Sequence, residues 1–219
     1  MPDEATWQLI RESLGPLLEG TLTGTIPLTV VSFAGGLVVA LMRLSPVPPV
    51  AAVARFYVSV IRGTPLLLQL FIIYYGLPSM GVTIDPFPSA VIAFSLNVGG
   101  YASEVVRAAI LSVPRGQSEA AATVGMDYAT TMRRIVLPQA TRVAVPPLSN
   151  TLISLVKDTS LASTIQVTEL LRKAQEAAAP TYEFFALYGV AAVYYWVICL
   201  VLSFSQTRLE IRLDRYVAA

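Results

Sequence analysis

Apolar residues gather in five long blocks along the chain, separated by shorter polar segments. An α-helix needs about 20 mostly apolar residues to cross a bilayer, and each block is that long. The blocks cover residues 20–42, 61–82, 87–108, 142–163 and 183–205. The pattern predicts an all-α membrane protein with five transmembrane helices in a single domain over residues 1–219.

The composition agrees with a multi-pass membrane protein. Hydrophobic residues make up 55% of the chain and charged residues 13%, whereas soluble domains carry about 25% charged residues. The chain has no histidine, and its one cysteine, Cys199, lies in an apolar block. A disulfide within the chain and a cysteine-based metal site are therefore excluded. The acidic N-terminal stretch does not have the pattern of a cleavable signal peptide, so we expect the first membrane helix to serve as its own signal.

Basic residues are distributed unevenly over the segments between the apolar blocks. Of the 15 Lys and Arg residues, all but four fall on the side that holds the central polar stretch. These are Arg43, Arg55, Arg62, Arg107, Arg115, Arg133, Arg134, Arg142, Arg208, Arg212 and Arg215. Loops rich in Lys and Arg stay in the cytoplasm. We therefore expect the N-terminus outside, and the central stretch and the C-terminus in the cytoplasm.

The central polar stretch, residues 115–140, is predicted to form two short helices below the membrane. Ser118 is a candidate N-cap for an alanine-rich helix, and Gly125 supplies a left-handed residue at its end. Asp127 is placed to cap a second helix that we expect to end at Pro138. From composition alone, an ordinary amphipathic loop is an equally good interpretation.

The residue order in this stretch resembles a known signature. Glu119-Ala120-Ala121, then Gly125, then Ile135-Val136-Leu137-Pro138 is similar to the coupling loop of bacterial ABC importer permeases. Further segments resemble the polar amino acid importer permeases, the histidine, glutamine and arginine group: residues 62–70, 95–97, 147–150 and 154–161, with Tyr101, Glu104 and Arg107. Residues 40–46, 73–78 and 116–122 look most like the L-cystine permeases within that group.

This resemblance implies a type I ABC importer permease fold in the bacterial inner membrane, with five helices per subunit. It also implies a second permease subunit, a dimer of cytoplasmic ATPases and an extracytoplasmic solute-binding protein. The residues expected to couple to the ATPase are Glu119, Ala120, Ala121, Gly125, Met126 and Arg134.

Ionisable residues inside predicted spans are expensive to bury and suggest a site. Helical spacing places Asn97, Tyr101 and Glu104 on one face of the third span. The fourth span has a similar face, made of Asn150, Ser154, Lys157 or Asp158, and Leu161. We hypothesise a cavity between them for the ammonium and carboxylate of an amino acid. Its candidate residues are Gln69, Asn97, Tyr101, Glu104, Asp158, Thr159 and Ser160.

Two alternatives to substrate contact stay open for these charges. Lys157 could pair with Asp158 or Glu104 to lock helices together, since buried opposite charges often fix register. Glu104 could instead meet Arg107 near the cytoplasmic end.

The chain lacks the glycine-rich loop Gly-x-x-x-x-Gly-Lys-Ser/Thr that cradles nucleotide phosphates. We therefore expect a transport subunit that is not an enzyme and carries no cofactor, with ATP and Mg²⁺ bound by a partner ATPase and no nucleic-acid partner. The predicted function is import of a polar amino acid by alternating access, with L-cystine favoured. Glutamine or arginine is the alternative substrate, and an ion-gradient-driven secondary transporter is the alternative from another class.

Overall fold

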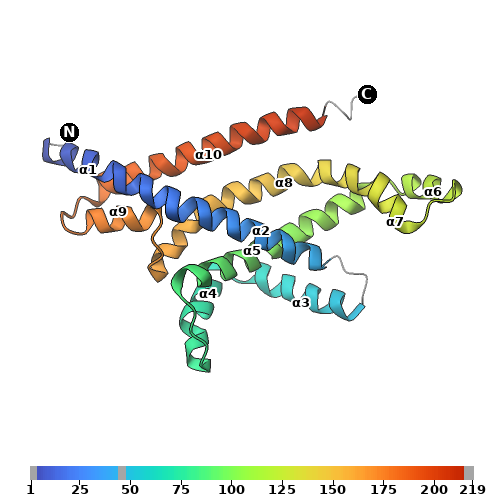
Figure 1. Cartoon of the computed structure of the whole chain (residues 1–219), viewed down its shortest axis with the longest axis horizontal. Helices are drawn as coiled ribbons and strands as arrows, with labels where there is room; N and C mark the ends of the chain where they lie inside the picture. Colours follow the sequence, from blue (N-terminus) through green and yellow to red (C-terminus); the bar gives the residue numbers. More distant parts are fainter. Residues whose placement is uncertain (1–3, 44–47, 215–219) are drawn as a thin grey trace.

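The structure is a computed structural model that describes residues 4–43 and 48–214. These residues contain helices and no strand, which confirms the all-α prediction. Figure 1 shows the helices in an elongated arrangement. In chain order they are α1 (Glu4–Gly20), α2 (Ile26–Arg43), α3 (Pro48–Gly63), α4 (Leu66–Phe71), α5 (Pro86–Ser112), α6 (Arg115–Thr123), α7 (Tyr128–Thr131), α8 (Leu137–Asp158), α9 (Leu170–Ala178) and α10 (Phe184–Asp214).

Short π-helical and 3-10 turns join two helices or extend the end of one. The π-helical turns are η1 (Thr21–Thr25), η2 (Ile72–Gly76) and η4 (Met132–Val136), and the 3-10 turns are η3 (Leu77–Met80) and η5 (Thr159–Ile165). The predicted domain, residues 1–219, extends past the described residues at both ends, and Arg215 lies outside them.

Three helices among the described residues are long and apolar enough to cross a membrane: Glu4–Leu37, Pro86–Ser112 and Phe184–Leu213. A fourth is added if Ala52–Gly63 and Leu66–Met80, which meet at an angle of 109°, form one broken span. The fourth predicted block, residues 142–163, corresponds to α8 and η5, whose polar residues lower its hydropathy. The count of five spans stays a prediction.

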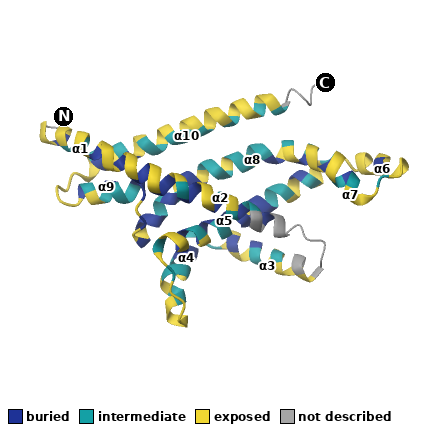
Figure 2. Cartoon of the chain, in the orientation of Figure 1, coloured by how far each residue is buried: buried dark blue, intermediate teal, exposed yellow. Residues whose placement is uncertain are grey.

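The core lies where α2 crosses α5, as the band of buried residues in Figure 2 shows. Glycines make this crossing close. A Cβ atom on Gly36 would lie 2.5 Å from Val98 Cγ1, and one on Gly35 would lie 2.6 Å from Ser95 Oγ. Phe94 fills the same region and is fully buried. Small residues allow membrane helices to approach in this way, because association there depends on close packing.

The α3–α4 bend follows directly from Thr64-Pro65. Pro65 has no backbone N–H and takes an extended conformation, with ψ at 139°, so the helix of α3 cannot continue through it. Leu66 begins a new helix in another direction. The predicted second span, residues 61–82, is therefore a bent segment whose first residues belong to α3.

A buried carboxyl group fastens α9 to the other helices. Glu169 is fully buried and caps α9, accepting hydrogen bonds from the backbone N–H groups of Leu171 (2.9 Å) and Arg172 (2.7 Å). The hydroxyl of Tyr195 on α10 donates to its Oε2 at 2.7 Å. Thr25 of η1 accepts from the N–H of Leu170 at 3.2 Å. The cluster therefore joins residues that lie 145 positions apart in the chain, Thr25 and Leu170.

Because the Glu169 carboxyl group is shielded from water, losing one of its hydrogen-bond donors should destabilise the cluster. Burial raises the pKa of the Glu169 carboxyl, and its hydrogen bonds from Tyr195 and the backbone lower it in part. A buried acceptor without its donor is costly. Close backbone approach adds to this constraint, since a Cβ atom on Gly24 would lie 2.1 Å from the carbonyl oxygen of Thr168.

The change Tyr195→Phe removes one donor from Glu169 and should destabilise the folded chain by about 1–2 kcal/mol. The measurement is the unfolding free energy of the purified protein in detergent. Tyr194→Phe is the matched control, because the Tyr194 hydroxyl donates to the Leu14 carbonyl at 3.1 Å in an exposed position. Equal stability of the two variants would contradict the role given to Glu169.

Candidate functional site

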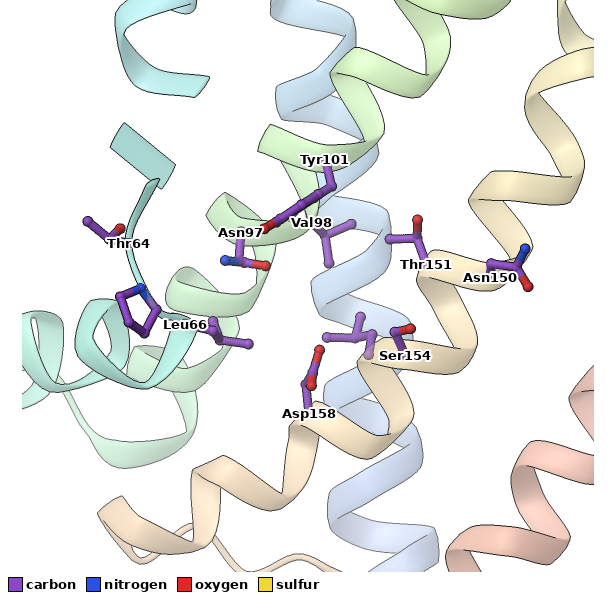
Figure 3. A pocket seen from close by; sticks show the side chains of 11 residues that line it. Thr64, Leu66, Asn97, Val98, Tyr101, Asn150, Thr151, Ser154 and Asp158 are labelled. Carbon is purple, nitrogen blue, oxygen red and sulfur yellow. The ribbon is translucent and has the colours of Figure 1, made fainter. Parts of the chain in front are cut away.

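A cavity of about 430 Å³, lined by both polar and apolar side chains, lies between the start of α4, the middle of α5 and the last turns of α8. Figure 3 shows its lining side chains on these three elements, with Asp158 of α8 pointing toward α5. Three of the predicted substrate residues, Asn97, Tyr101 and Asp158, line it. The other lining residues are Thr64, Pro65, Leu66, Val98, Asn150, Thr151, Ser154 and Leu155.

Helical spacing explains how α5 and α8 supply opposite walls. Asn97 and Tyr101 are one turn apart on α5, and Ser154 and Asp158 are one turn apart on α8. The two helices pack against each other at Ala109, Ala140 and Ala144, away from the cavity. Small side chains at that contact bring the two helices together, while the polar faces stay apart further along.

Gln69 lies behind the wall and does not line the cavity. It is 8% exposed. Its Nε2 donates to the carbonyl oxygens of Ile61 (2.8 Å) and Thr64 (3.1 Å), which the bend at Pro65 leaves without helical partners. Asn97 Nδ2 donates to its Oε1 at 3.1 Å. The structure thus places this predicted residue one contact away from the cavity.

Glu104 is paired within its own helix. Arg107 Nε donates to Glu104 Oε1 at 2.9 Å, in the arrangement that the sequence left open as an alternative. Glu104 does not line the cavity. Tyr101 does, and the guanidinium carbon of Arg62 lies 5.5 Å from the centre of its ring, a cation–π distance.

Consecutive residues of a helix face different ways. The three predicted substrate residues at the end of α8 therefore lie in different surroundings: Asp158, Thr159 and Ser160. Asp158 faces the cavity (Figure 3). Thr159 is fully buried, and its hydroxyl donates to the Val156 carbonyl at 2.7 Å. Ser160 lies with Lys157 in a separate hollow against α10. Direct substrate contact by Thr159 and Ser160 stays an untested prediction.

Lys157 makes no ion pair within 4 Å among the residues that the structure describes. It faces Tyr195, Trp196 and Cys199 of α10, on the side of α8 away from the cavity. Locking of helices by a Lys157–Asp158 or Lys157–Glu104 pair is therefore not present in this structure.

The central stretch forms two helices joined by a tight turn, at the end of the molecule marked by α6 and α7 in Figure 1. Gly125 has a φ of +78°, as predicted for a left-handed helix end. Its N–H donates to the Ala122 carbonyl (3.0 Å), and the Met126 N–H donates to the Ala121 carbonyl (3.0 Å). This pair of bonds is the Schellman motif.

Asp127 caps the second helix, as predicted. Its Oδ1 accepts from the Thr130 N–H at 3.1 Å, and this bonding lowers the pKa of the carboxyl. Two expectations were wrong. Ser118 is not an N-cap, because α6 begins at Arg115 after Pro114. The second helix does not end at Pro138, because η4 runs on into α8 with that proline in the first turn, where it needs no N–H partner.

The predicted coupling residues differ in exposure. Glu119, Ala120, Gly125 and Arg134 are exposed, Met126 is half-buried, and Ala121 is 2% exposed, so it packs inside the loop. Two large side chains that the prediction omitted, Val124 (73% exposed) and Tyr128 (80% exposed), flank the turn. The sequence could have pointed to them through their position beside Gly125, in a turn that projects into solvent.

Comparison with known proteins identifies the kind of molecule that carries these features. Residues 6–215 match the family described as binding-protein-dependent transport system inner membrane component. The chain belongs to this family. Members of the family are permease subunits, so this chain is a membrane transport subunit of an ABC transporter.

Individual relatives align along almost the whole chain. The L-cystine transport system permease protein TcyB of Bacillus subtilis (strain 168) is 58% identical over 217 residues, covering 97% of this chain and 93% of the relative. The glutamine transport system permease protein GlnP of Escherichia coli (strain K12) is 38% identical, covering 94% of this chain and 97% of the relative.

Two solved structures of ABC transporters share the fold. The crystal structure of an amino acid ABC transporter with histidines contains a chain that is 35% identical, with a TM-score of 0.88 and 97% of this chain covered. A chain of the inward-facing MetNI methionine ABC transporter is 20% identical, with a TM-score of 0.66 and 97% coverage, and shows likeness of fold alone. The type I ABC importer permease fold predicted from the sequence is thus confirmed.

Proposed function

We propose that this chain is the permease subunit of an ATP-driven importer of L-cystine. The observation that carries this proposal is the 58% identity to an L-cystine permease over 97% of the chain. The cavity supports it, because its lining offers polar groups from α5 and α8 to a small zwitterion within a largely apolar chain.

The proposed complex contains a second permease subunit, two ATPases that bind ATP and Mg²⁺, and an extracytoplasmic solute-binding protein. The bias of basic residues supports an N-terminus outside and a C-terminus in the cytoplasm. This orientation places α6 and α7 in the cytoplasm, where the ATPases would bind. The exposed tyrosine at the turn, Tyr128, suits such a contact.

The proposed mechanism is alternating access. Because α7, η4 and α8 form one uninterrupted course, a push on the α6–α7 turn would reach the cavity wall through α8. Asp158 lies at the far end of that helix. Closure of the ATPases around ATP would thus reorient the cavity through this continuous helical segment, while the partner ATPases bind the nucleotide.

Substrate identity is tested by reconstituting the permease with its ATPases and binding protein in proteoliposomes. ATP-dependent uptake of labelled L-cystine should be reduced by unlabelled L-cystine much more than by glutamine, arginine or histidine at the same concentration. Preferential competition by glutamine or arginine would assign the chain to that substrate. Uptake that needs no ATPase would contradict the proposal as a whole.

Coupling is tested at Gly125, whose φ of +78° a β-branched residue does not tolerate. Gly125→Val should remove most of the stimulation of ATP hydrolysis by the loaded binding protein. Gly125→Asn should keep it, because asparagine adopts the left-handed region. The comparison of these two variants is not complicated by a steric clash, because no heavy atom lies within 4 Å of a Cβ atom added at Gly125. Normal stimulation in an intact Gly125→Val complex would contradict the proposed lever.

A further inference from the structure

The orientation of the Gln69 side-chain amide is determined by its surroundings. Three acceptors lie around its Nε2: the carbonyl oxygens of Ile61 (2.8 Å) and Thr64 (3.1 Å), and Thr64 Oγ1 (2.9 Å). The Thr64 hydroxyl already donates to the Val60 carbonyl at 2.9 Å, so its oxygen accepts from Gln69. A carbonyl oxygen cannot donate. Nε2 must therefore face the bend, and Oε1 must face away from it.

This orientation fixes the neighbouring amide in turn. Gln69 Oε1 is an acceptor, so Asn97 must present Nδ2 to it, at 3.1 Å. An amide that donates on one side offers its oxygen on the other. Figure 3 shows the Asn97 nitrogen on the side of Thr64 and its oxygen on the opposite side. The cavity thus receives an acceptor from Asn97.

A second acceptor faces the same cavity from the other wall. The Asp158 carboxyl group extends from the end of α8 toward α5 and Leu66 (Figure 3). Two oxygen acceptors on facing walls suit a group that carries several N–H donors, and the ammonium of an amino acid has three. A flipped Asn97 would instead direct an NH₂ group at the ammonium.

We propose that Gln69 is a positioning residue that sets the polarity of the cavity, holding the Asn97 oxygen toward the α-ammonium of the substrate. The proposal rests on the proposed function, because it assigns one end of the same cavity. Gln69 acts through Asn97 and does not touch the substrate. The α3–α4 bend contributes to this orientation, because Pro65 leaves backbone carbonyl groups without helical donors and these groups orient Gln69.

The test uses the permease–ATPase complex in nanodiscs without the binding protein. Two probes are compared, L-cystine and 3,3′-dithiodipropionic acid, which has the same skeleton and lacks both ammonium groups. The measured quantity is the ratio of their dissociation constants, here called the ammonium preference. Wild type should favour L-cystine.

Four complexes are compared to separate a positioning role of Gln69 from a merely structural one: wild type, Gln69→Met, Asn97→Asp and the double variant. Gln69→Met frees Asn97 to rotate and should lower the ammonium preference about tenfold, the effect of one hydrogen bond to a charged group. Asn97→Asp offers oxygen on both sides and adds a negative charge, so it should at least keep the preference. In this Asn97→Asp background Gln69→Met should no longer lower the preference, because a carboxylate has no wrong orientation. A structural defect at the bend would lower the preference equally in both backgrounds.

Gln206→Met is the matched control. Gln206 of α10 also bonds an asparagine amide, donating to Asn150 Oδ1 at 3.2 Å, but Asn150 points away from Asp158 and Asn97 in Figure 3. Its ammonium preference should equal that of wild type. Asn97→Leu should lose the preference, and this variant decides the role of Asn97 where the Gln69→Met complex does not assemble.

Three outcomes would overturn the proposal: an unchanged preference in Gln69→Met, an unchanged preference in Asn97→Leu, or a Gln69→Met loss in the Asn97→Asp background as large as in wild type. In each case L-cystine still binds and the proposed function stands. Absence of binding of L-cystine and of other amino acids to the wild-type complex would overturn the proposed function together with this inference.

Discussion

A polar group enclosed in apolar surroundings needs a hydrogen-bond partner, and the described part of this chain is arranged around that requirement. The break at Pro65 leaves backbone carbonyl groups without helical donors, and Gln69 satisfies two of them. The carboxyl of Glu169 is satisfied by its own helix and by Tyr195 of α10. A buried polar group without a hydrogen-bond partner costs roughly several kcal/mol in apolar surroundings. These hydrogen bonds therefore hold the helices in their relative positions.

The same requirement separates structural polar residues from those available to a ligand. Gln69, Thr159 and Glu104 use their polar atoms within the chain. Asp158 lines the cavity, and none of the hydrogen bonds or ion pairs given above occupies its carboxyl group. A polar side chain can therefore bind a ligand only where its polar atoms are not already bonded within the chain, as at the cavity walls on α5 and α8. The uninterrupted course from α7 to α8 connects those walls to the exposed turn at Gly125.

Much of this arrangement could be predicted from the sequence. Helical periodicity placed Asn97 and Tyr101 on one face, and the conformational freedom of glycine predicted the left-handed turn at Gly125. The bend angle at Pro65 and the buried position of Glu169 could not be predicted, because both depend on contacts between distant segments. Pro138 shows the limit of local rules: a proline ends a helix in its interior and is tolerated in its first turn, and the sequence does not say where a joined helix begins.

The function proposed for this chain depends on the cavity between α5 and α8 carrying the substrate. The most direct measurement is ATP-dependent L-cystine uptake by Ser154→Trp, which fills the cavity from an exposed position on its α8 wall. Val201→Trp is the matched control, because Val201 is 60% exposed on α10 and lines a separate apolar groove. The Ser154→Trp complex should assemble and hydrolyse ATP but not transport L-cystine, while the Val201→Trp complex should transport it normally. Wild-type uptake by Ser154→Trp would contradict the proposed role of the cavity.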